Sequence, residues 1–179
     1  LDEVYAAADA IKAHPTRLNA FAAPQTGPLA ALVEDRVVPL GLPVRDAMTA
    51  TRRALGSVSG ERQPVALLWM GLDEPGGILE AMLASPDRLG YRGAVIGAMG
   101  GGHVPERVAA LMARLAAAMP TVVSGRAGGG PLLRHTYGGP SSEIELLKAG
   151  LTWGGRLHPL KARVLLETCL RAGLDRAAI

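Results

Sequence analysis

Cysteine, aromatic residues and long apolar runs are scarce in this sequence, and each shortage excludes a class of protein. The single cysteine, Cys169, allows no internal disulfide, and with only four histidines it argues against a zinc site. Six aromatic residues are too few for a platform on which nucleic-acid bases stack. No apolar run approaches the roughly 18 residues that a membrane-spanning helix needs.

Positive charge is present but dilute. The net charge of +3 arises mainly from sixteen arginines and three lysines, and Arg52-Arg53 is the only basic doublet. Without a dense basic patch, we expect neither a nucleic-acid nor a membrane partner. Nearly half of the 179 residues (49%) are apolar. This is enough for the core of one domain, or of one domain with part of another.

The first part of the chain has few regular patterns. It starts at Leu1 without methionine or signal peptide, in what reads as mid-protein sequence, so we expect a truncated start. Proline and glycine predict a loop over 21–28, and residues 33–40 predict a short hairpin that turns at Glu34-Asp35. Residues 41–60 lack periodicity and are the best linker candidate.

Strands and helices alternate after Gln63. Continuous apolar runs at 65–70 and 93–99 and a shorter one at 121–124 are typical of strands buried on both faces of a parallel sheet. Helical spacing of apolar residues predicts helices over 78–83 and 104–119, and two more are expected at 142–149 and 159–172. We therefore predict a small doubly wound α/β domain over 63–179.

Two glycine-rich loops, 97–103 and 125–130, follow predicted strands, where α/β sheets bind ligands. The first has neither the G-x-G-x-x-G nor the P-loop spacing, so it predicts either a tight turn or a close approach to a ligand. His103 lies at the mouth of this turn. The second loop predicts a lid or a solvent-exposed connection, and Tyr137 either packs or contacts a ligand. There is no G-x-S-x-G motif, and Cys169 lies in a helix, which favours a core position over a nucleophile.

Several passages, in order, resemble the L-asparaginase/glutaminase family of threonine amidohydrolases. The strongest runs from Gly150 through His158-Pro159-Leu-Lys161-Ala-Arg163 and is similar to the C-terminal helix of that family. The strand and glycine-rich turn at 90–105 and the Thr136-Tyr137-Gly…Ser142-Glu143 loop are similar to its second domain. Residues 2–21 are similar to the segment that carries its catalytic lysine.

The resemblance implies three regions: a remnant of the N-terminal catalytic domain at 1–42, a linker at 43–62 and a complete Rossmann-like or flavodoxin-like C-terminal domain at 63–179. Family members are about twice as long, and both of their catalytic threonines would precede Leu1. The residues alone would leave Lys12 on a solvated surface. The resemblance instead implies that Lys12 relays a proton to activate a threonine nucleophile. We expect residues 1–179 alone to be inactive.

The resemblance also implies a reaction and its partners. Threonine attacks the side-chain amide of asparagine, ammonia leaves and water releases aspartate, with no metal or cofactor. The second domain closes the site of a neighbouring subunit, so a homodimer or homotetramer is expected. The resemblance makes His103, Tyr137 and Glu143 the candidates for substrate binding in this domain. Many family members carry asparagine at the position of His103 and glutamate at the position of Tyr137.

Replacement of that glutamate by Tyr137 would remove a charge contact with the substrate's amino group, unless Glu143 or Glu145 supplies it. We expect a cytoplasmic location. Two other interpretations remain open. One is a non-catalytic binding or regulatory domain with the same fold, and the other is a nucleotide-binding domain that uses the 100–102 turn.

Overall fold

The computed structural model describes residues 2–41, 52–53, 55–56, 58 and 60–179. Contacts divide the chain into two compact units, Leu1–Arg53 and Ala54–Ile179. Much of the predicted 43–62 linker lies outside the described residues. The domain boundaries at 42/43 and 62/63 remain predictions.

The N-terminal unit is built from short antiparallel strands. Three of them form one sheet in the order β1-β4-β5, and two form a separate ladder. Their bounds are β1 Glu3–Val4, β4 Ala30–Val33 and β5 Arg36–Pro39 for the sheet, and β2 Ile11–Lys12 and β3 Phe21–Ala22 for the ladder. The predicted hairpin is confirmed, although its first strand begins at Ala30 rather than Val33. Its turn places Glu34 in the left-handed region (φ 53°), as tight two-residue turns require.

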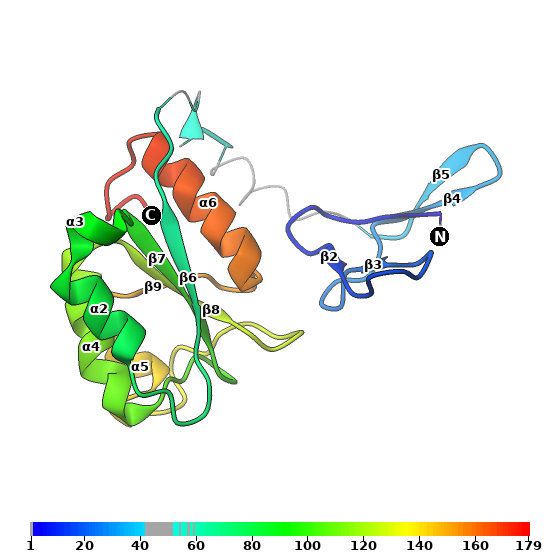
Figure 1. Cartoon of the computed structure of the whole chain (residues 1–179). Coiled ribbons are helices and arrows are strands. Elements are labelled where there is room, and N and C mark those ends of the chain that lie inside the picture. Colours follow the sequence, from blue (N-terminus) through cyan, green and yellow to red (C-terminus); the bar gives the residue numbers. More distant parts are fainter. Residues whose placement is uncertain (1, 42–51, 54, 57, 59) are drawn as a thin grey trace. The chain divides into compact units, whose positions relative to one another are not determined.

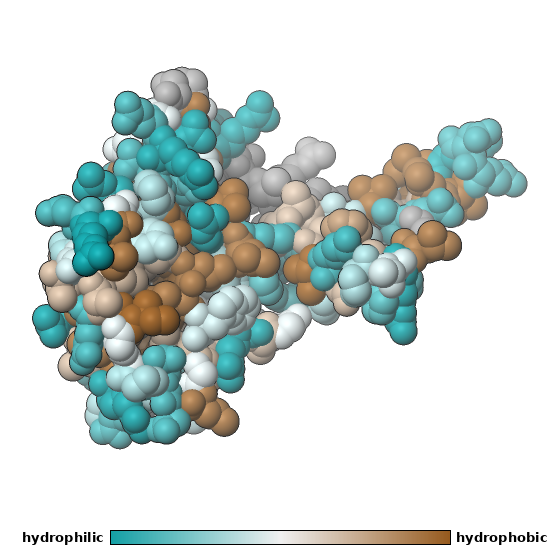
Figure 2. Space-filling view, viewed as in Figure 1, coloured by the Kyte–Doolittle hydropathy of each residue, from teal (hydrophilic) through white to brown (hydrophobic). Residues whose placement is uncertain are grey.

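The hairpin leaves apolar side chains uncovered within its own unit. Its tip is hydrophilic and its base is hydrophobic (Figure 2). Leu32 and Val37 form a cross-strand pair and are 47% and 62% exposed. The small N-terminal sheet thus has an unburied apolar surface.

The C-terminal unit contains a four-stranded parallel sheet (Figure 1). The strands occur in the order of the sequence: β6 Val65–Trp69, β7 Gly93–Ala98, β8 Thr121–Gly125 and β9 Thr152–Trp153. The first three confirm the predicted strands. The sequence pattern did not predict β9, because two residues give no periodicity.

Helices connect the strands as predicted, with two differences. They are α2 Gly77–Ala84, α3 Pro86–Leu89, α4 Glu106–Ala118, α5 Glu143–Lys148 and α6 Pro159–Arg171. The short α3 was not predicted. The prediction that a helix begins at Val104 is wrong, because α4 begins at Glu106. Pro105 precedes it with extended backbone (φ −58°, ψ 138°) and so cannot be its first helical residue.

Both faces of the sheet are covered, which confirms the predicted α/β class. The helices α2, α4 and α5 lie on one face and α6 lies on the other (Figure 1). Along β7, Ile96 packs with the core of the first face and Val95 packs with that of the second. The second core consists of Val65, Val95, Val122, Ala162 and Leu166. A strand buried on both sides needs apolar residues throughout, and this explains the continuous run in the sequence.

Both glycine-rich loops leave the sheet at its carboxyl edge, as expected. The first follows Ala98 at the end of β7, and the second follows Gly125 at the end of β8. The predicted core position of Cys169 is also confirmed, and burial raises the pKa of its thiol. No helix within the described ranges is long and apolar enough to cross a bilayer.

Removal of the Leu166 side chain should test how far the sheet depends on α6. Leu166 is 2% exposed, so we expect Leu166→Ala to lower the free energy of unfolding by about 2–5 kcal/mol. Val164 lies on the same helix but is 60% exposed. Val164→Ala should therefore change stability by no more than about 0.5 kcal/mol. Urea unfolding of both variants measures the difference, and equal losses would contradict the packing described for α6.

Candidate functional site

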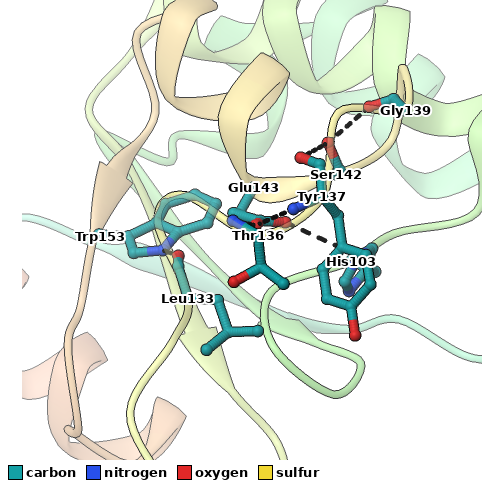
Figure 3. Close-up of polar contacts among 8 residues, drawn as sticks. All are labelled: His103, Leu133, Thr136, Tyr137, Gly139, Ser142, Glu143 and Trp153. Atoms are coloured by element: carbon teal, nitrogen blue, oxygen red, sulfur yellow. Dashed lines mark hydrogen bonds and ion pairs between the residues drawn. The ribbon is translucent and has the colours of Figure 1, made fainter.

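Two segments that are separate in sequence meet near the carboxyl edge of the sheet (Figure 3). They are the turn at 99–104 and the loop at 131–142, which continues into Glu143, the first residue of α5. Of the predicted substrate-binding residues, His103 comes from the first segment, and Tyr137 and Glu143 come from the second. Tyr137 contacts both of the others.

The turn that carries His103 is closed by its own backbone. Met99 and His103 exchange N–H···O hydrogen bonds of 2.9 Å in both directions. Two glycines allow this closure, with φ of 47° at Gly100 and 123° at Gly102. The second value is accessible almost only to glycine.

The glycines of this turn also allow it to pack closely against protein atoms. A Cβ on Gly101 would lie 2.6 Å from Leu133, and one on Gly102 would lie 2.9 Å from Trp153. The Leu133 N–H donates to the Gly101 carbonyl (2.8 Å), and Trp153 Nε1 donates to the Leu133 carbonyl (2.6 Å). The close approach that the glycines suggested is therefore made by the 131–142 loop and β9.

The Glu143 carboxylate forms hydrogen bonds with the backbone of the same loop. Its side chain is completely buried. One carboxylate oxygen, Oε1, accepts hydrogen bonds from the backbone N–H groups of Thr136 (2.8 Å) and Tyr137 (2.7 Å). Hydrogen bonds to an ionised carboxylate are about twice as strong as those between neutral groups. The charge of Glu143 thus determines where the Tyr137 backbone lies.

Sequence reasoning did not identify Ser142, which secures the other end of the loop. Ser142 precedes α5, but its hydroxyl does not cap that helix. It donates instead toward the carbonyls of Tyr137 (2.7 Å) and Gly139 (2.6 Å). A serine just before a helix is a recognisable sequence signal, but it usually indicates capping. The hydrogen bonds of Ser142 to the preceding residues depend on the loop conformation, which the sequence signal does not reveal.

The other carboxylate oxygen of Glu143 faces His103. Its Oε2 lies 3.7 Å from His103 Nε2, which is within ion-pair range but too long for a hydrogen bond. Among the described residues, Oε2 is the only buried side-chain polar atom without a hydrogen-bond partner. The imidazole also meets the Tyr137 ring edge to face, with centroids 4.8 Å apart at 72°.

The pKa of the Glu143 carboxyl reflects opposing effects. Burial has the largest effect and raises the pKa. The N–H donors of Tyr137 and Thr136 lower it, with help from its own N–H and from His103. The donors outweigh burial, and the pKa lies below its ordinary value. The folded site therefore keeps Glu143 ionised.

The other residues singled out in the sequence lie outside the contacts among His103, Tyr137 and Glu143. Lys12 lies in the N-terminal unit, where it is exposed on β2 and pairs with Phe21 of β3. Glu145, the alternative source of charge, forms an ion pair with Lys148 at 2.8 Å. At the second glycine-rich loop, Arg126 donates from Nη1 to the Met70 carbonyl (2.8 Å). The proposed lid role of residues 125–130 stays a prediction.

The side chains of the described part of the chain do not form a cluster of three or more histidine, cysteine, aspartate or glutamate residues that could hold a metal ion. What the site offers is a buried carboxylate behind two partly exposed rings. The side chain of His103 is 29% exposed, and Tyr137 is 50% exposed. Such an arrangement can orient a polar ligand.

A family of known proteins matches this chain in sequence, and a solved structure matches it in fold. The sequence model of the family described as Glutaminase/Asparaginase C-terminal domain matches residues 65–179. The fold is similar to that of the probable cytoplasmic L-asparaginase from Campylobacter jejuni, with a TM-score of 0.74 and 21% sequence identity. That match covers 98% of this chain and 50% of the other, so the chain spans about half the length of that asparaginase.

The ionised state of Glu143 predicts an acid-sensitive fold. Its pKa is lower in the folded than in the unfolded chain, so it stabilises the fold above its unfolded pKa. That contribution is lost as the pH falls through the folded pKa. Glu143→Gln should reduce stability at neutral pH by on the order of 1 kcal/mol and flatten the acid limb of stability against pH. Urea unfolding from neutral to acid pH measures both effects.

Glu145→Gln is the matched control, because Glu145 lies on the same helix but pairs at the surface with Lys148. Its acid limb should resemble that of the unsubstituted chain. An unchanged acid limb in Glu143→Gln would contradict the role assigned to the buried charge.

Proposed function

Because the chain belongs to the Glutaminase/Asparaginase C-terminal domain family, we propose that it is the C-terminal part of an L-asparaginase, which hydrolyses L-asparagine to L-aspartate and ammonia. The family match over 65–179 carries this proposal. Further support comes from the N-terminal unit, because the fold match extends over 98% of the chain rather than stopping at the C-terminal domain. Because the similar Campylobacter jejuni protein is described as a probable cytoplasmic L-asparaginase, we also propose a cytoplasmic location.

The proposed reaction is a two-step acyl transfer. A threonine hydroxyl in a preceding segment attacks the side-chain amide carbon, and ammonia leaves as the acyl-enzyme forms. Water then attacks the ester, aspartate is released and the hydroxyl regains its proton. We propose that Lys12 relays the proton that activates the threonine. Its exposed position on β2 leaves the amine accessible for that task.

We further propose that the C-terminal unit closes the active site of a neighbouring subunit in a homodimer or homotetramer. The substrate-binding role predicted for His103, Tyr137 and Glu143 is assigned to their cluster. Two observations support this assignment. The three residues come from two separate segments, 99–104 and 131–143, yet meet at the carboxyl edge, where such sheets bind ligands, and both rings remain partly exposed.

Residues 1–179 alone should release no ammonia from asparagine, because the threonine segments that the reaction needs are not in this sequence. A coupled ammonia assay on the purified chain measures this, with a complete asparaginase as the positive control. Clear ammonia release would contradict the proposed division of the machinery. If a longer protein containing this chain also lacks activity, the non-catalytic binding or regulatory function gains support.

In that longer protein, Lys12→Ala should lower kcat by about 10²–10⁴-fold, the usual contribution of a proton-transfer group. Stability should change by no more than about 0.5 kcal/mol, because Lys12 is exposed. Lys148→Ala, another exposed lysine, is the matched control and should retain activity. Retained activity in Lys12→Ala would refute the assigned role.

A further inference from the structure

Lys12 lies at the end of a very short ladder. Strands β2 and β3 each contain two residues and pair apart from the other sheets, with Lys12 opposite Phe21. A single two-stranded hairpin is at best marginally stable in water. Residues 13–20 join the two strands. The shape of this loop must therefore help to hold the lysine in place.

The loop closes directly after Lys12. The N–H groups of Ala13 and His14 both donate to the carbonyl of Ala20, over 2.7 and 3.3 Å. These hydrogen bonds continue the pairing of the two strands beyond Lys12. Opening of the loop would therefore release the end of β2 that carries the lysine.

The side chain of His14 fixes the first half of this loop. Its Nδ1 accepts hydrogen bonds from the backbone N–H groups of Thr16 and Arg17, each over 3.1 Å. The hydroxyl of Thr16 lies 3.4 Å from the same nitrogen. Pro15, between them, has a restricted φ and no N–H to donate. One ring nitrogen thus holds the turn at 14–17 together.

We infer that His14 is a positioning residue for Lys12: its imidazole fixes the turn at 14–17, and this turn keeps the lysine amine where it can relay a proton. The inference rests on the proposed function, since it needs the catalytic role of Lys12. His14 itself touches neither the substrate nor the reacting atoms in this assignment. It acts through the backbone that directly follows Lys12.

Hydrogen-bond chemistry determines which residue can replace His14. A ring nitrogen that accepts hydrogen bonds is unprotonated, so the neutral ring carries its proton on Nε2. The side-chain oxygen of asparagine is attached to Cγ, as Nδ1 is in histidine, and it commonly accepts from N–H groups two or three residues ahead. Alanine has no side-chain acceptor. His14→Asn should therefore preserve the turn, whereas His14→Ala should open it.

The effect on catalysis should appear in kcat. A displacement of about 1 Å can cost a catalytic group about 10²-fold in rate, so we expect His14→Ala to lower kcat by about 10–100-fold. KM should stay unchanged, because the proposed substrate-binding cluster belongs to the C-terminal unit. A general loss of folding would not separate the two constants in this way.

The first test uses the 179-residue chain and requires no turnover. Amide hydrogen exchange followed by NMR measures the protection of the Ala13, Thr16 and Arg17 N–H groups. His14→Ala should raise their exchange rates by about tenfold, the effect of losing hydrogen bonds of ordinary strength. His14→Asn should restore the rates. Leu18→Ala is the matched control, because Leu18 lies in the same loop but is 92% exposed.

Unchanged exchange rates in His14→Ala would overturn the inference. So would a proton on Nδ1 of His14 in the unsubstituted chain, which the nitrogen chemical shifts of the 15N-labelled ring report. If the N-terminal unit of His14→Ala does not fold, His14→Asn decides. Preserved protection in that variant supports the role of the acceptor atom, and lost protection overturns it.

The second test measures kcat and KM for asparagine in the longer protein. His14→Ala should lower kcat alone, His14→Asn should recover most of it, and Leu18→Ala should retain both constants. Faster amide exchange with unchanged kcat in His14→Ala would show a merely structural turn and overturn the positioning role.

Failure of the proposed function gives a different result. The unsubstituted longer protein would then release no ammonia, or Lys12→Ala would keep full activity, and the inference would fall with the proposal. Activity that depends on Lys12 but not on His14 overturns the inference alone. The two failures are therefore distinguishable.

Discussion

The candidate site depends on one buried carboxylate. An ionised glutamate inside a protein needs donors, and Glu143 finds them in the backbone N–H groups of Thr136 and Tyr137. The loop, in turn, is held at Thr136 and Tyr137 by the carboxylate. Charge and loop conformation therefore require each other. Their mutual dependence explains why a residue type that is rarely buried is fully buried here.

The glycine-rich turn and the small strand β9 complete the same assembly. Gly101 and Gly102 bring the turn against Leu133 and Trp153, and Trp153 returns a hydrogen bond to the Leu133 carbonyl. A side chain on either glycine would displace this packing, and the φ of 123° at Gly102, which residues with a side chain rarely adopt, adds a second restriction. Two loops from different strand ends are thus joined into one structure. The glycines serve the protein's own packing here.

The sequence predicted the large elements well and the contacts between loops poorly. Strands β6 and β7 were predictable because burial on both faces demands continuous apolar runs, and α4 because its buried stripe has helical spacing. The two-residue strand β9 offered no such signal. From the residues alone, His103 and Tyr137 were consistent with packing as well as with binding, and a lone histidine is more often structural. Family resemblance selected them, but the burial of Glu143 and the role of Ser142 arise from tertiary contacts that no local pattern encodes.

The short sheet of the N-terminal unit has a consequence for handling the chain by itself. Strand β5 lies at an edge of the described sheet, and all four of its residues are exposed. An edge strand with free backbone groups and exposed valines is a template for pairing with another molecule. Arg36 and Pro39 at its two ends oppose such pairing through charge and a missing N–H donor. Self-association of the isolated chain would therefore begin between these ends, at Val37 and Val38.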